Sequence, residues 1–258
     1  MISKSLIIVA IALFFLPDIQ AQERTENEEE AKQIFERVDE RRSQIDSETA
    51  QLEMIIYDPR GRTRTRVIRS FTANHNGNTR SLLLFESPGS VRGTGFLSIR
   101  EGGSDVQRLY LPDVGRIQTI SASERGGRFM GSDFTYEDLG DQDPDDYQFL
   151  WMEEDETRYR VHARKADSDL YEALTFHIRK ETYAVAKIEF YNEEDTLIRR
   201  LEAENFENPY GDYWSPKKMT MFDLQEDRKT EIIWNERNIN ESIPDWRFTE
   251  RGLRRGLN

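Results

Sequence analysis

Three histidines and the triplet Gly131-Ser132-Asp133 are the residues of this sequence whose types we consider for catalysis. His75 precedes an Asn-Gly turn, and His162 and His177 alternate with apolar residues in expected strands, so we expect all three to face solvent. Ser132, inside the triplet, could act as a nucleophile, but no base can be assigned to it and the sequence has no Gly-x-Ser-x-Gly elbow. The sequence therefore predicts no catalytic residue and a protein that is not an enzyme.

Two acidic runs have the residue types of metal ligands. Asp141, Asp143 and Asp145 alternate like the start of a calcium loop, but the sixth position has no Gly and the twelfth is Met152 instead of Glu. We therefore expect the run to be a solvated acidic connector, and the second run, residues 153–156, to be a charged turn. The sequence also has no Gly-rich phosphate loop, so we expect neither a metal nor a cofactor.

Composition restricts the function further. The 258 residues include 36 Lys and Arg against 49 Asp and Glu, which gives a formal charge of −13. An acidic surface argues against binding nucleic acid, whose phosphates need cationic partners, and against tight docking on anionic lipid. With no Cys in the sequence, disulfides, thiol nucleophiles, Cys-ligated zinc and thioether lipid anchors are excluded.

The N-terminus is typical of a cleaved secretory signal peptide, predicted at residues 1–21. Lys4 supplies a positive start, Leu6 to Leu16 form an uninterrupted apolar run, and Ala21 precedes a plausible cleavage point. The run is shorter than the roughly 20 residues that a membrane span requires. We therefore expect residues 22–258 to form a single soluble domain in a bacterial periplasm, without a lipid anchor and as a monomer.

The remaining chain predicts one helix followed by strands. Apolar residues recur at helical spacing over residues 25–45, where Thr25 and Glu28 match a capping box. From residue 51 the period changes to two, and Asn76-Gly77 is typical of a hairpin turn. Counting such segments gives about eleven strands. We expect one strongly curved antiparallel sheet, with the helix and an irregular segment covering one face.

The irregular segment spans residues 123–140. Asp133 could cap a short helix running to Leu139, and the neighbouring glycines permit backbone changes that other residues resist. The segment 128–139 could be a mobile lid over a pocket or a fixed plug that closes the end of the sheet. Both interpretations remain open from the sequence.

Three arginines form a basic ladder in this acidic chain. Arg62, Arg64 and Arg66 share one face of an expected strand. They could meet an acidic partner or a lipid headgroup, and pairing with carboxylates on a neighbouring strand is the simpler expectation.

One helix and one short segment could hardly fill the interior of so large a sheet, so we expect an apolar pocket. Met and Phe side chains would give it an adaptable lining. The candidates for the pocket or its lid are Met54, Phe71, Phe85, Phe96, Phe129, Met130, Phe134, Met219, Met221 and Trp234. For each of them, a place in an ordinary packed core is the alternative.

Four stretches in order resemble the LolA-like outer-membrane lipoprotein-sorting family. They are residues 85–97, with the core Pro88-Gly89-Ser90-Val91-Arg92-Gly93-Thr94-Gly95-Phe96-Leu97, residues 106–112, which end in Leu109-Tyr110-Leu111-Pro112, residues 128–139, which begin Arg128-Phe129-Met130-Gly131-Ser132-Asp133-Phe134, and Phe248-Thr249-Glu250-Arg251-Gly252-Leu253. Each piece is short, but their order and spacing fit from about residue 30 to residue 255.

The resemblance implies an incomplete, strongly curved antiparallel barrel closed by an N-terminal helix and a short helical lid. It also implies a periplasmic protein whose interior takes acyl chains of a lipid or a lipidated protein, without chemistry. Some members of this branch look like partners of inner-membrane exporters of the RND class. A non-catalytic accessory module for such an exporter is therefore the alternative function.

Overall fold

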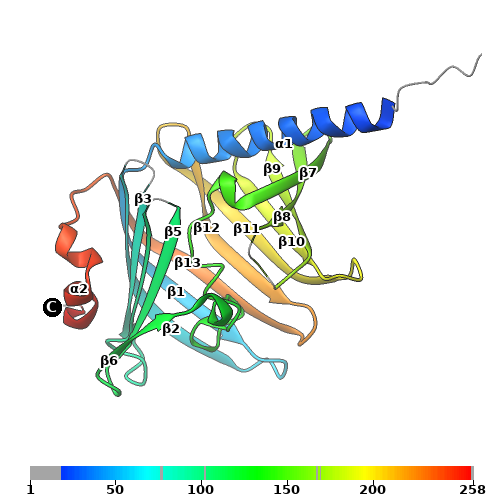
Figure 1. Cartoon of the computed structure of the whole chain (residues 1–258). Coiled ribbons are helices and arrows are strands. Elements are labelled where there is room, and N and C mark those ends of the chain that lie inside the picture. The colour runs from blue at the N-terminus through cyan, green and yellow to red at the C-terminus, as the bar shows by residue number, and fades with distance from the viewer. Residues whose placement is uncertain (1–18, 76–77, 102, 167, 169, 257–258) are drawn as a thin grey trace, which may run out of the picture.

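The structure is a computed structural model that describes residues 19–75, 78–101, 103–166, 168 and 170–256 (Figure 1). Most of the predicted signal peptide, residues 1–18, lies outside the described residues. Within them, no helix combines the length and the apolar character needed to cross a membrane.

The described strands form one antiparallel sheet in the order β6-β5-β4-β3-β2-β1-β13-β12-β11-β10-β9-β8-β7. The strands are β1 (Ser47–Tyr57), β2 (Thr63–His75), β3 (Asn78–Ser87), β4 (Gly95–Glu101), β5 (Ser104–Leu111), β6 (Arg116–Ile120), β7 (Tyr147–Glu154), β8 (Arg158–Lys165), β9 (Ala173–Arg179), β10 (Val185–Tyr191), β11 (Leu197–Tyr210), β12 (Tyr213–Asp223) and β13 (Arg228–Ile239). The predicted curved antiparallel sheet is confirmed, with thirteen strands in place of about eleven.

The chain order explains the shape of the sheet. Both β1–β6 and β7–β13 run as meanders, and β1 joins the two by pairing with β13. β6 and β7 are at opposite edges, so the sheet stays open and the 121–146 connection must cross from one edge to the other. Figure 1 shows this connection and α1 on the concave side of the sheet, while α2 lies outside it.

α1 (Ile19–Arg42) packs its apolar stripe on the concave face. Ala31, Ile34 and Phe35 are buried, and the Phe35 ring lies 4.7 Å from the ring of Phe176 between centroids. The predicted limits of 25–45 are wrong at both ends. The helix is continuous through Thr25, and Ile45 is buried beyond the last turn.

The 121–146 connection contains only short 3-10 turns, η1 (Ala122–Glu124), η2 (Phe129–Gly131) and η3 (Pro144–Asp146). The predicted helix capped by Asp133 is therefore wrong. Thr135 instead pairs with Arg128 in an isolated antiparallel bridge, and residues 136–139 form turns.

The C-terminal segment, η4 (Asp245–Phe248) and α2 (Glu250–Arg255), covers a second apolar cluster on the outer face of β2–β5. Close approach explains the glycines of two motif segments. A Cβ on Gly95 would lie 2.6 Å from Cδ1 of Leu253, and one on Gly252 would lie 2.2 Å from the carbonyl oxygen of Arg247. The backbone contact excludes a larger residue at Gly252, while a larger residue at Gly95 would require the Leu253 side chain to move.

Candidate ligand-binding cavities

The centre of the concave face is filled by a plug, residues 128–136 of the connection. Phe129 is fully buried, and its ring centroid lies 5.2 Å from that of Phe96 and 5.8 Å from that of Phe85. Met54 and Phe134 belong to the same buried cluster. Side chains of the protein itself therefore occupy this part of the interior.

Polar contacts hold the plug on β12 and β13 of the sheet. The Asp133 side chain is fully buried, 3.0 Å from Nε of Arg228, and its Oδ2 accepts a 2.6 Å hydrogen bond from the hydroxyl of Thr230. Arg128 pairs with Asp223 at 2.5 Å and with a neighbouring glutamate. These contacts tie the plug to β12 and β13.

An apolar cavity of about 350 Å³ lies between α1 and the concave face of β10–β12. Most of its lining is aliphatic or aromatic. The sheet contributes Val185, Ile188, Leu201, Ala203 and Met219, α1 contributes Phe35 and Val38, and Tyr183, Phe206, Tyr213 and Trp214 complete the wall. Asp39, Arg41 and Lys187 also line it.

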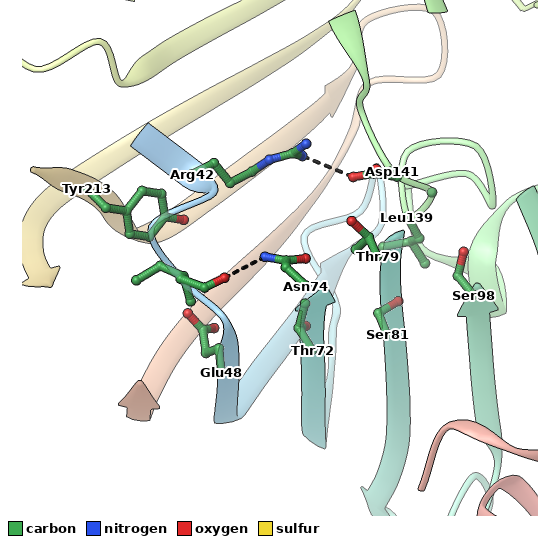
Figure 2. A pocket seen from close by; sticks show the side chains of 12 residues that line it. Arg42, Glu48, Thr72, Asn74, Thr79, Ser81, Ser98, Leu139, Asp141 and Tyr213 are labelled. Atoms are coloured by element: carbon green, nitrogen blue, oxygen red, sulfur yellow. Dashed lines mark hydrogen bonds and ion pairs between the residues drawn. The ribbon is translucent and has the colours of Figure 1, made fainter. Parts of the chain in front are cut away.

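A polar pocket of about 240 Å³ lies at the end of the concave face formed by β1–β4 (Figure 2). Its floor is one row of residues in register across four strands, Glu48, Thr72, Ser81 and Ser98. Figure 2 shows their side chains with Asn74 and Thr79 beneath Arg42 and Asp141. The pocket shares Arg42, Asn74, Thr79 and Asp141 with a wider polar cleft of about 1010 Å³.

An ionic cluster borders this pocket. Arg100 donates two 2.8 Å hydrogen bonds to the carboxylate of Asp146, and it lies 3.3 Å from Asp143 and 3.9 Å from Asp141. Burial by itself would lower the pKa of Arg100, but the Asp146 hydrogen bond and the three negative charges raise it. The expected solvated connector is thus wrong for the three aspartates that surround the buried Arg100, while Asp145 is exposed.

The structure places the ten predicted pocket residues in three environments. Met219 lines the apolar cavity. Met54, Phe85, Phe96, Phe129, Phe134 and Met221 are buried in the main core, and Met130 and Trp234 pack against it partly exposed. Phe71 is on the other face of the sheet, where Arg247 lies 4.6 Å above its ring, so its assignment to the interior is wrong. A role in ligand binding stays a prediction for the others.

The sequence reasoning missed most of the apolar lining. Ile188, Leu201 and Ala203 alternate in their strands and were visible as inward-facing positions. The spacing of apolar residues in the sequence does not show that these strand residues face the apolar stripe of α1. Most of the Met and Phe side chains expected in an adaptable lining fill the core instead.

The candidate catalytic residues are not brought together. Ser132 is fully buried, and its hydroxyl donates to the carbonyl oxygen of Phe134 at 3.3 Å. The His162 ring stacks on Trp151 at 3.3 Å, and burial lowers its pKa to about 4. His177 is buried beside Glu189, at 2.7 Å, so the expectation that it faces solvent is wrong.

The arginine ladder departs from the expectation that its residues pair with carboxylates on a neighbouring strand. Arg66 is buried on the concave face, cross-strand from Met54, with its guanidinium 5.7 Å above the Phe85 ring. Within the described residues it has no ion pair, and burial together with Arg64 lowers its pKa. Arg62 pairs with Asp58 at 2.6 Å, but this carboxylate lies in the preceding turn and not on a neighbouring strand, so the expected cross-strand pairing is wrong for Arg62 as well.

Three solved structures share this architecture. A domain from Vibrio parahaemolyticus whose name assigns it to outer membrane lipoprotein sorting has a TM-score of 0.81 and 27% identity, over 88% of this chain and 100% of that one. A DUF1329 family protein from Desulfovibrio piger has a TM-score of 0.80 and 22% identity, over 88% and 99% of the two chains. A LolA superfamily protein from Nitrosomonas europaea has a TM-score of 0.66 and 20% identity, over 85% and 97%.

The open curved sheet with its covering helix is thus a LolA-like fold. The pattern of one family, described as an uncharacterized protein, matches residues 77–255, more than half of the chain. The chain belongs to this DUF1329 family. No curated protein matches the sequence.

Proposed function

We propose that the protein is a periplasmic carrier or chaperone that binds the hydrocarbon part of a lipid or of a lipidated protein and performs no chemistry. The observation that carries the proposal is the apolar cavity between α1 and β10–β12. The likeness to a domain named for lipoprotein sorting supports the same role. The predicted signal peptide supports the compartment.

The size of the cavity suits one hydrocarbon chain. Its volume of about 350 Å³ lies at the lower end of the range for small-molecule sites, roughly 300–1,000 Å³. At roughly 30 Å³ per water-sized group it has room for about a dozen methylenes. At about 0.8 kcal/mol for each buried methylene, such a chain would gain on the order of 10 kcal/mol before the costs of association.

We expect Ala203→Trp to weaken binding of a fluorescent fatty acid such as cis-parinaric acid by at least about tenfold. Ala203 pairs with Met219 across β11 and β12, and both side chains line the cavity, so an indole there takes the place of the chain. Displacing only two methylenes corresponds to roughly tenfold in affinity. A fluorescence titration measures the effect.

Val114→Trp is the matched control, because Val114 is 53% exposed at the β5–β6 turn and lines neither cavity. Equal affinity of the wild-type protein and both variants would contradict the proposed cavity. The alternative, an accessory of an inner-membrane RND-type exporter, predicts capture of that protein from envelope extracts by lipid-free chain.

A further inference from the structure

Two cavities of opposite character meet at one pair of side chains. Arg42 and Tyr213 line both the apolar cavity and the polar pocket, so these two side chains form the boundary between the two spaces. Figure 2 shows Tyr213 and Arg42 near one end of the polar pocket, with Ser98 near the other. A single molecule could therefore occupy both spaces across this boundary.

From this juxtaposition we propose that the cargo is a single-chain amphiphile with an uncharged, hydroxylated headgroup of about the size of glycerol. The hydrocarbon chain lies in the apolar cavity and the headgroup lies in the polar pocket. This inference rests on the proposed carrier function and adds the chemical class of the cargo.

Three hydroxyl groups of the pocket are free to bind such a headgroup, while that of Ser98 already donates to Asp105. Thr72 and Ser81 are paired across β2 and β3, and Thr79 is in the next inward row of β3. Their hydroxyls make no hydrogen bond within the described residues, although all three line the pocket. Each can donate one hydrogen bond and accept others, which suits a ligand that also does both.

The charged groups of the pocket are already paired. Arg42 lies 3.2 Å from Asp141 and 2.7 Å from Asp39. Glu48 lies 3.3 Å from Arg237. No cation of the lining is therefore left to neutralise a phosphate, and a phosphate would meet the two acidic side chains of the pocket. An uncharged headgroup avoids both costs.

The dimensions agree with this division. About 240 Å³ corresponds to roughly eight water-sized groups, and a glycerol headgroup has six heavy atoms. The pocket joins the wider polar cleft through Asn74 and Thr79, which gives the headgroup a polar route from solvent.

The test compares three palmitoyl ligands in competition with cis-parinaric acid, namely monopalmitoylglycerol, methyl palmitate and palmitoyl lysophosphatidic acid. We expect the wild-type protein to bind the glycerol ester at least about tenfold more tightly than either of the others. Thr72→Val and Thr79→Val remove a hydroxyl at nearly constant shape, and each should reduce this preference about threefold to tenfold. Thr119→Val, at an exposed position of β6, is the control.

Each outcome decides one of the two proposals. Equal binding of the three ligands, or tighter binding of the phosphate, overturns the headgroup inference while the carrier function stands. If the probe does not bind, and direct titration of the glycerol ester shows no binding either, the carrier function is overturned and this inference with it. The comparison of ligands on the wild-type protein holds even if a variant fails to fold.

Discussion

Arg100→Met is expected to lower the free energy of unfolding by about 3–5 kcal/mol. The Arg100 side chain is only 9% exposed and is the shared partner of Asp141, Asp143 and Asp146. Methionine keeps the length of the side chain but leaves these carboxylates partly buried without that partner. For a domain of this size the loss corresponds to a fall of roughly 6–20 °C in Tm, measurable by thermal or urea unfolding.

Arg66→Met is the matched control for this prediction. Arg66 is as buried as Arg100, at 8% exposed for the residue, but it has no ion pair within the described residues. Removing a buried, unpaired charge relieves a desolvation cost, so we expect unchanged or increased stability. Equal losses in the two variants would show that burial, and not the ionic cluster, determines the effect.

The second prediction concerns the plug. Asp133→Asn should release residues 128–136 from the sheet, because the ion pair with Arg228 is lost while the shape of the side chain is kept. We expect the free energy for local opening to fall by about 3 kcal/mol, which is on the order of 100-fold faster amide exchange in peptides covering the plug. Hydrogen exchange followed by mass spectrometry measures it.

Asp145→Asn, whose side chain is 82% exposed, serves as the control. The double variant Asp133→Asn with Arg228→Gln should lower the free energy for local opening by less than the sum of the two single variants, because both changes remove the same interaction. Unchanged exchange in the plug of Asp133→Asn would mean that the ion pair with Arg228 does not hold the segment in place, and that its other contacts do.

The sheet was predictable from sequence because alternation of apolar and polar residues survives in most strands. β8 is a clear case, where Val161 and Ala163 are buried between more exposed neighbours. β7 is not predicted, because the acidic residues at its end, Glu153 and Glu154, are typical of a charged turn. Alternation at the other end of that strand, Tyr147 and Phe149, carried the correct signal.

The plug and the ionic cluster were not predictable, because their partners are distant in the sequence. Asp133 meets Thr230, and Arg100 meets Asp146, through contacts that depend on the path of the connection across the sheet. Local rules assigned the two aspartates to a helix cap and to solvent. The sequence around Asp133 resembles a helix cap and that around Asp146 resembles a solvated loop, but tertiary contacts determine where the two side chains lie.

The polar pocket was also not predictable from the sequence, because it depends on the register of several strands. Thr72, Ser81 and Ser98 look like ordinary polar residues of three strands. They form one floor only because β2, β3 and β4 pair in a register that aligns them. Hairpin turns indicated which strands pair, but the register across all of them needed the structure.

Native mass spectrometry of the protein purified from its own cell envelope tests the carrier proposal most directly. We predict that wild-type protein retains a bound amphiphile with one hydrocarbon chain, and that Ala203→Trp, which fills the apolar cavity, retains much less. Wild-type protein that is free of lipid under gentle ionisation, and that also fails to bind a fluorescent fatty acid, would contradict the account.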